Sequence, residues 1–364
     1  VSYNMVTGTQ VAGKGPTGDL LNADEYADLQ WLVYENDGTV ETHPLYGLST
    51  NEEPSMPPWA ANTDWYDVIT DNAGMQNHDL TLSGNTDKAR FFAGLGYFRQ
   101  NGIIIHTHSE RYNARFNSVW SLLKDRVKMG ENVTLSYRSK LSVPNLSESS
   151  PVLTGPYRSQ SIIPVVMSES VSGFWHNFVP GEYGGTGIAP RLGNSPNTYA
   201  DLTRAKDNTY HDIRLIGSIY VDAMILKGLN YRSVFGGTWN NGYGVNYRFA
   251  TYENSENIST PSLNENAYYG NDWVWTHTLT FNRSFGKHTV LAVAGIEAIK
   301  YGIGRNLSAT RNGYFSDAVD FRTLNNGSAI AAANSESYTP TKISSQFIRA
   351  DFDFNPREWG LLIL

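Results

Sequence analysis

The sequence predicts an all-β protein, a portion of an antiparallel up-and-down transmembrane β-barrel with long extracellular loops and short periplasmic turns. Two observations carry this prediction: apolar and polar residues alternate within segments, and long and short connectors alternate between them. In Met75–Trp120, Phe91 and Leu95 share one parity, and Arg90 and Gly94 share the other. A period of two residues places each set on one face of a strand. A face lined by Arg and Asn is too polar for a soluble core but suits a barrel with lipid outside and water inside.

This alternation predicts the direction of individual side chains. The residues expected to point to lipid are Phe91, Leu95, Phe116, Leu135, Leu215 and Phe352. The residues expected to point to the lumen are Arg90, Arg115, Asn117, Arg138, Arg214 and Asp351. Aromatic residues near strand ends are expected to form an interfacial girdle; they are Tyr97, Tyr112, Trp120, Tyr137 and Trp275.

The connectors sort by length. Gly84–Lys88, Leu122–Arg126 and Ser284–Lys287 are short turns, whereas Ser142–Asn208 and Tyr301–Thr341 are long. In an up-and-down barrel the short turns lie at the periplasmic rim and the long loops outside. A soluble β-sandwich, the alternative, has no reason to sort its loops in this way. We therefore expect the short turns at one rim and the long loops at the other.

About eleven strands are expected, each an alternating segment bounded by turn residues. They are Val1–Val11, the strands within Met75–Trp120, then Val127–Leu141, Thr209–Ala223, Tyr231–Trp239, Trp273–Arg283, His288–Lys300, Ile343–Phe354 and a last strand at 359–364. Asn240–Asn271 and Tyr301–Thr341 are expected to be polar loops. Ser142–Asn208 is expected to be a long loop without internal elements, and such loops usually have a function.

Two helices are expected in the first long connector. Leu20–Tyr34 has Asn22 as its N-cap, and its apolar stripe consists of Leu29, Leu32 and Val33. A shorter helix, Trp65–Ile69, begins after the capping sequence at 62–64.

Composition excludes several classes of function. The 364 residues carry a net charge of −7, with a pI near 5.6, so there is no basic footprint for nucleic acid. The absence of cysteine excludes disulfides, thiolate catalysis and Cys-based metal sites. No run of about 18 apolar residues is present, so no transmembrane helix is expected.

No motif indicates an enzyme, a metal site or a cofactor. Neither a Ser–His–Asp arrangement nor paired carboxylates can be recognised. His106 and His108 could face one metal ion, but a solvated hairpin tip is the favoured interpretation. Gly184–Gly187 lacks the Lys-Ser/Thr and the helix of a phosphate-binding loop and is interpreted as a loop bend.

Several segments resemble one known family. They are NADEYADL (Asn22–Leu29), NTDWYDVI (Asn62–Ile69), MQNHDLTLSGNTDKARFFAGLGYFRQNGII (Met75–Ile104), RYNARFN (Arg111–Asn117), YGGTGIAPRLGN (Tyr183–Asn194), GSIYVDAMILKGLNYRSVFG (Gly217–Gly236) and NDWVWTHTLTFNRSFGKHTVLAVAGIEA (Asn271–Ala298). In this order they resemble the SusC/RagA-like family of TonB-dependent outer-membrane transporters.

The resemblance implies a barrel of about 22 strands, normally plugged by an N-terminal domain. Residues 1–364 are then expected to be a partial barrel domain, without the plug, the TonB-contacting segment and the C-terminal half of the barrel. The implied function is TonB-dependent import of oligosaccharides or peptides across the outer membrane. The implied partners are a SusD-like surface lipoprotein, the TonB complex acting through the plug, and outer-membrane lipid.

Four loop aromatics are the candidate substrate-binding residues: Tyr157, Phe174, Trp175 and Tyr183. Exposed aromatic rings beside Asn and Arg suit stacking on sugar faces or contact with a peptide. The alternatives are packing within the loop and contact with a lipoprotein. Two other functions stay open, a passive porin-like channel and a soluble carbohydrate-binding β-protein.

Overall fold

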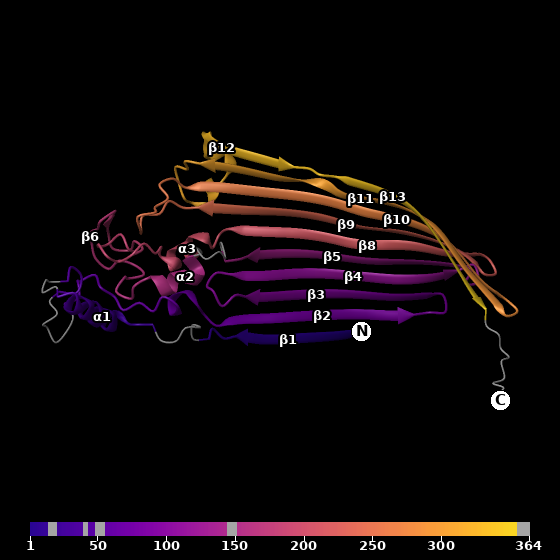
Figure 1. Cartoon of the computed structure of the whole chain (residues 1–364), viewed down its shortest axis with the longest axis horizontal. Coiled ribbons are helices and arrows are strands. Elements are labelled where there is room, and N and C mark those ends of the chain that lie inside the picture. The colour runs from indigo at the N-terminus through magenta and orange to yellow at the C-terminus, as the bar shows by residue number, and fades with distance from the viewer. Residues whose placement is uncertain (14–19, 39–42, 48–54, 144–150, 355–364) are drawn as a thin grey trace, which may run out of the picture.

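The computed structural model describes residues 1–13, 20–38, 43–47, 55–143 and 151–354. One antiparallel sheet of eleven strands dominates this part of the chain, and its strands lie side by side in Figure 1. The strands are β1 (Ser2–Gln10), β2 (Ala73–Asn85), β3 (Ala89–Asn101), β4 (His108–Leu122), β5 (Val127–Leu141), β8 (Thr209–Leu226), β9 (Leu229–Arg248), β10 (Ser262–Phe285), β11 (His288–Asn312), β12 (Ser328–Ser337) and β13 (Thr341–Phe354). Successive strands pair in chain order, and β11 pairs with both β12 and β13. This order confirms the predicted up-and-down topology.

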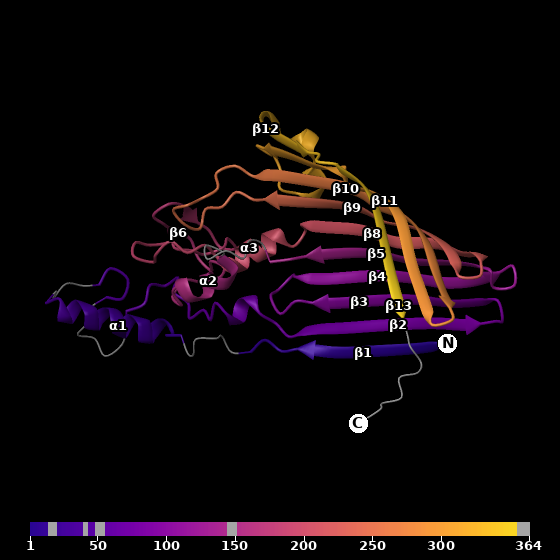
Figure 2. The same ribbon diagram turned by 45° about the vertical axis from the view of Figure 1, so that its right-hand side comes forward.

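The connectors divide between two rims of the sheet. The tight turns that join β2 to β3, β4 to β5, β8 to β9 and β10 to β11 lie together at one end, called the turn rim (Figures 1 and 2). The helices and the small β6–β7 hairpin lie at the opposite end, called the loop rim. Asn85 ends β2 at the turn rim, whereas Trp175 lies between β6 and β7 at the loop rim. The predicted sorting of short and long connectors is therefore confirmed.

The register places the two predicted sets of side chains on opposite faces. Leu95 pairs with Ala114, and Ala114 pairs with Leu135, so these apolar residues form one row on one face. The adjacent row, on the other face, includes Arg115 paired with Thr134. Each residue expected to face lipid falls on the first face, and each residue expected to face the lumen falls on the second. We call them the apolar face and the polar face.

Aromatic rings form a row on the apolar face near the loop rim. The ring centroids of Tyr97 and Tyr112 are 4.9 Å apart, and those of Tyr112 and Tyr137 are 6.3 Å apart. The hydroxyls of Tyr97 and Tyr112 both donate to Glu110 Oε1, at 3.0 and 2.8 Å. Trp275, in contrast, lies well inside β10 rather than at a strand end, which corrects its expected position.

The strands β9 and β10 are longer than predicted. Asn240–Asn271 is wrong as a loop, because β9 continues to Arg248 and β10 already begins at Ser262. Asn246 pairs with Asn264 in this extension. Backbone ladder hydrogen bonds do not require apolar side chains, so a strand can extend past its apolar band. The polar side chains of residues 240–271 alone therefore led to the wrong prediction of a loop.

The segment Tyr301–Thr341 is likewise only partly a loop. The strand β11 runs to Asn312, and β12 returns along it from Ser328. Two 3-10 helices lie between them, η2 (Val319–Phe321) and η3 (Leu324–Asn326). The last strand expected at 359–364 lies outside the described residues.

The two longest connectors fold into a cap at the loop rim. Its elements are α1 (Ala23–Asn36), the 3-10 helix η1 (Asp67–Ile69), α2 (Pro151–Arg158), β6 (Val171–Ser172), β7 (Asn177–Phe178) and α3 (Thr198–Ala205). Trp31, Tyr46, Trp65, Ile163 and Phe178 belong to one buried cluster that joins both connectors. The expectation that Ser142–Asn208 has no internal elements is wrong. Its helices and hairpin are too short to show a hydrophobic period in the sequence.

The helix α1 begins as predicted but packs through a different face. Asn22 Oδ1 accepts a hydrogen bond from Glu25 N, and Glu25 Oε2 accepts one from Asn22 N, both at 2.9 Å. The buried face carries Ala23, Ala27 and Trp31. The predicted apolar stripe is instead exposed; it consists of Leu29, Leu32 and Val33. Across the described residues, no helix combines the length and apolarity needed to span a bilayer.

Two tyrosine rings lie over glycines on the polar face of the sheet. A Cβ added to Gly130 would lie 2.5 Å from the Tyr220 ring, and one added to Gly242 would lie 2.2 Å from the Tyr268 ring. Each glycine pairs directly with its aromatic neighbour across the ladder. Each ring occupies the space that a side chain would need, so a larger residue at either glycine would displace the ring.

Candidate functional site

The structure separates the four predicted aromatics. Phe174 and Trp175 lie together between β6 and β7, with their ring centroids 4.9 Å apart and their planes at 84°. They are 62% and 56% exposed, so neither is a packing residue of the cap. Tyr157 lies near the end of α2 and lines a cleft, whereas Tyr183 is half-buried inside the cap. Ligand contact by these residues stays a prediction.

Tyr183 takes part in a buried cluster around Arg204. The guanidinium carbon of Arg204 lies 5.1 Å from the centre of the Tyr183 ring and 5.5 Å from that of Tyr252. Arg204 Nη2 donates to Glu253 Oε1 at 2.5 Å, and these side chains are only 13% and 4% exposed. Burial, with repulsion from Glu253, raises the pKa of Asp201 to about 6, although Arg204 opposes this shift. The cluster joins α3 and residue 183 of the cap to the connector between β9 and β10.

The glycine run at 184–187 packs closely at the loop rim, against the β9–β10 connector and against Pro164. Gly187 N donates to Glu253 O at 2.7 Å. A Cβ on Gly185 would lie 2.3 Å from that same oxygen, and one on Gly184 would lie 2.2 Å from Pro164 O. Backbones meet here without room for side chains, which explains the glycines without a phosphate ligand.

The largest described cleft at the loop rim has a volume of about 1290 Å³. It lies between the first long connector, the end of α2 and residues 191–193. Rings of Tyr26, Tyr66 and Tyr157 line it, together with Asn and Ser side chains. Its charged lining residues are Glu25, Asp64, Asp67, Asp71, Arg158 and Arg191.

Sequence reasoning found only Tyr157 in this cleft. It interpreted the residues at 62–64 as a helix cap, and Asp64 Oδ1 does accept hydrogen bonds from Tyr66 N and Asp67 N, at 2.9 and 3.0 Å. The arginines come from a segment far away in sequence, so no local spacing could reveal that they share a cavity with the acids. Only the packing of the two connectors brings them together.

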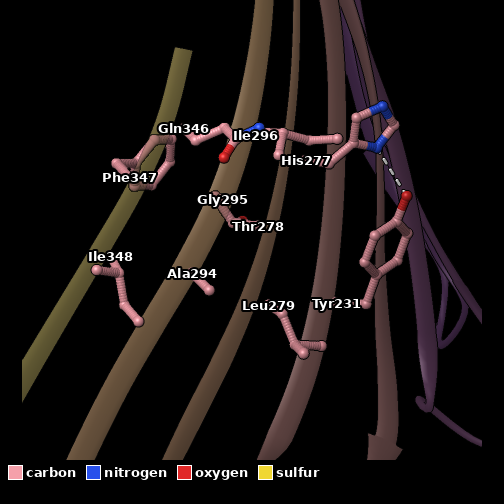
Figure 3. A pocket seen from close by; sticks show the side chains of 10 residues that line it. All are labelled: Tyr231, His277, Thr278, Leu279, Ala294, Gly295, Ile296, Gln346, Phe347 and Ile348. Carbon is pink, nitrogen blue, oxygen red and sulfur yellow. Dashed lines mark hydrogen bonds between the residues drawn. The ribbon is translucent and has the colours of Figure 1, made fainter.

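A second hollow, of about 480 Å³, lies mainly on the apolar face (Figure 3). Ala294 and Gly295 of β11 form its floor, between larger side chains of β10 and β13. Tyr231 and His277 are joined there by a hydrogen bond of 2.7 Å between the hydroxyl and Nδ1. Its lining has no carboxylate, lysine or arginine. The charged cleft at the loop rim is therefore the better candidate for a water-soluble substrate.

Comparison with known proteins gives relatives of one kind. No family model matches the chain. The chain is 25% identical over 357 residues to TonB-dependent receptor P3 of Formosa agariphila, covering 93% of this chain and 30% of that protein. It is 32% identical over 72 residues to TonB-dependent receptor SusC of Bacteroides thetaiotaomicron, covering 20% of this chain and 7% of that protein.

Solved structures share the fold. The structure of the RagAB peptide transporter matches with a TM-score of 0.69 at 17% identity, covering 97% of this chain and 40% of that chain. The same complex in its open-open state matches with a TM-score of 0.67 at 16% identity, with the same coverage of both chains. The chain thus spans less than half the length of the proteins that it matches.

Proposed function

We propose that the whole protein imports oligosaccharides or peptides across the outer membrane. The basis is that the chain belongs to the SusC/RagA-like family of TonB-dependent outer-membrane transporters. The apolar face then meets lipid, the polar face lines the lumen, and the cap faces the outside of the cell. A SusD-like lipoprotein closes over the cap and traps the substrate. Energy from the inner membrane, transmitted by TonB, displaces the plug and lets the substrate pass without covalent chemistry.

One observation carries this proposal: the register puts apolar and polar side chains on opposite faces, while the long connectors gather at one rim. A wall between lipid and water needs the first arrangement, and a receptor that captures its substrate on one side needs the second. The exposed stripe on α1 and the Phe174–Trp175 pair give the cap an apolar outer surface, which suits contact with a protein partner.

The test is uptake by cells that carry the whole protein, with and without TonB. Peptide and oligosaccharide mixtures are supplied at limiting concentration, and depletion of each component is followed by mass spectrometry. We expect uptake to require both the protein and TonB. Uptake that persists without TonB would identify a passive porin-like channel. Recovery of the protein from the aqueous phase without detergent would instead favour the soluble carbohydrate-binding protein.

Replacing Phe174 and Trp175 together by alanine is expected to reduce uptake severalfold to tenfold. An aromatic contact contributes on the order of 1 kcal/mol, and both rings are exposed where a substrate or lipoprotein can reach them. Barrel assembly, measured as surface abundance, should not change. Co-purification of the lipoprotein separates the two roles, since a loss of pairing indicates partner contact. Unchanged uptake at limiting substrate would contradict both a substrate contact and a lipoprotein contact by these two rings.

A further inference from the structure

Side chains of opposite charge line the cleft at the loop rim but do not pair with one another. Its acidic residues come from α1 and from residues 64–71, whereas Arg158 and Arg191 come from the second long connector. The described residues form seven ion pairs, and none of them uses a charged residue of the cleft. The two kinds of charge therefore share one cavity at separations beyond ion-pair distance.

One residue of each sign is fully available. Within the described part of the chain, the Asp67 carboxylate and the Arg158 guanidinium have neither a hydrogen bond nor an ion pair, and both side chains are exposed. The other charged residues are partly engaged. Glu25 caps α1, and Arg191 bonds the Tyr34 hydroxyl, with its guanidinium carbon 5.5 Å from the centre of that ring.

This distribution of charge discriminates between ligand classes. A neutral oligosaccharide would desolvate Asp67 and Arg158 without giving either an opposite charge. An acidic oligosaccharide could pair with the arginines, but it would also be repelled by four carboxylates in the same cavity. A peptide with free ends carries an ammonium for Asp67 and a carboxylate for Arg158, and both contacts are charge-assisted hydrogen bonds. The volume of about 1290 Å³ exceeds that of ordinary small-molecule pockets, which leaves room for several residues.

We infer that this cleft binds peptides by their charged ends, with Asp67 receiving the amino terminus and Arg158 the carboxyl terminus. The inference rests on the proposed function and names the substrate class of that site. Tyr66 and Tyr157 directly precede Asp67 and Arg158 in sequence and line the same cavity, so their rings are available to contact the bound peptide.

The experiment measures peptide retention by the whole protein, purified in detergent and immobilised. The probe is a peptic digest of casein, used untreated, N-acetylated, C-amidated, or with both modifications. Malto-oligosaccharides and oligogalacturonates are the neutral and acidic sugar probes. Retained molecules are identified by mass spectrometry. We expect the untreated digest to be retained at least about tenfold better than the doubly blocked digest or either sugar, since one charge-assisted contact corresponds to about tenfold in affinity.

Two variants assign the ends. Asp67→Asn should remove the preference for free amino termini while keeping that for free carboxyl termini, and Arg158→Gln should do the reverse. Asp125→Asn and Arg126→Gln are matched controls in the β4–β5 turn at the opposite rim, and both should behave like the unmodified protein. A merely structural role would lower retention of every digest alike and would not produce this reciprocal pattern.

Equal retention of blocked and untreated digests would overturn the inference, as would retention of a sugar in preference to peptides. Loss of both preferences in either variant would overturn the assignment of ends. Failure of the peptide inference can be distinguished from failure of the proposed function. TonB-dependent uptake of a sugar, without peptide retention, contradicts only the peptide site, whereas peptide uptake without TonB contradicts only the transport mechanism.

Discussion

Replacing Arg204 by methionine is expected to destabilise the cap by about 3–5 kcal/mol, because it leaves a buried carboxylate without its partner. Glu253 is only 4% exposed at its side chain, and Asp201 adds a second negative charge beside it. The substitution also removes the contacts of the guanidinium with the rings of Tyr183 and Tyr252. Hydrogen exchange of residues 183–187 and of α3, measured on the whole protein in detergent, should rise sharply.

The matched control is Arg305→Met. Arg305 pairs with Glu336 at 2.7 Å, but these side chains are 48% and 47% exposed, and exposed ion pairs contribute about 0–1 kcal/mol. A second variant, Arg204→Met combined with Glu253→Leu, should recover part of the lost protection, since it removes the unpaired carboxylate. Equal effects of the two single substitutions would show that the buried pair does not hold the cap together.

Replacing Leu135 by arginine is expected to block barrel assembly, whereas replacing Asn132 by arginine should be tolerated. These residues lie on opposite faces of β5, Leu135 in the row that pairs with Ala114 and Asn132 in the row that pairs with Asn117. An arginine exposed to lipid at mid-bilayer costs roughly 2–4 kcal/mol, and one in a watery lumen costs little. Heat-modifiable mobility and the amount of protein at the cell surface report assembly. The opposite order of tolerance would invert the assignment of lipid and lumen.

The sequence predicted the sheet because a period of two residues is a local signal that repeats from strand to strand. Residues Phe91 to Trp120 show this period clearly, and the register confirmed the face of the sheet on which each residue lies. The prediction failed where strands continue beyond their apolar band, as at Asn240–Arg248. There, polar side chains meet water as they would in a loop, while the ladder between backbones leaves no trace in the sequence.

The cap was harder to predict for a different reason. The start of α1 could be predicted from Asn22, because its capping box spans only a few residues. The buried face of that helix could not be predicted locally, because Trp31 packs in a cluster with Ile163 and Phe178 of the second connector. The cleft depends on the same long-range packing. Tyr157 was found as a loop aromatic, but the charges that surround it could be recognised only after folding.

The two tyrosine rings over glycines affect the width of the lumen in the proposed barrel. Tyr220 and Tyr268 lie along the wall, over Gly130 and Gly242, instead of projecting from it. Because each ring runs along the wall, it narrows the passage less than a tyrosine that projected from the wall would. Above Tyr220 the wall is completed by Arg232, whose guanidinium carbon lies 4.6 Å from the centre of that ring.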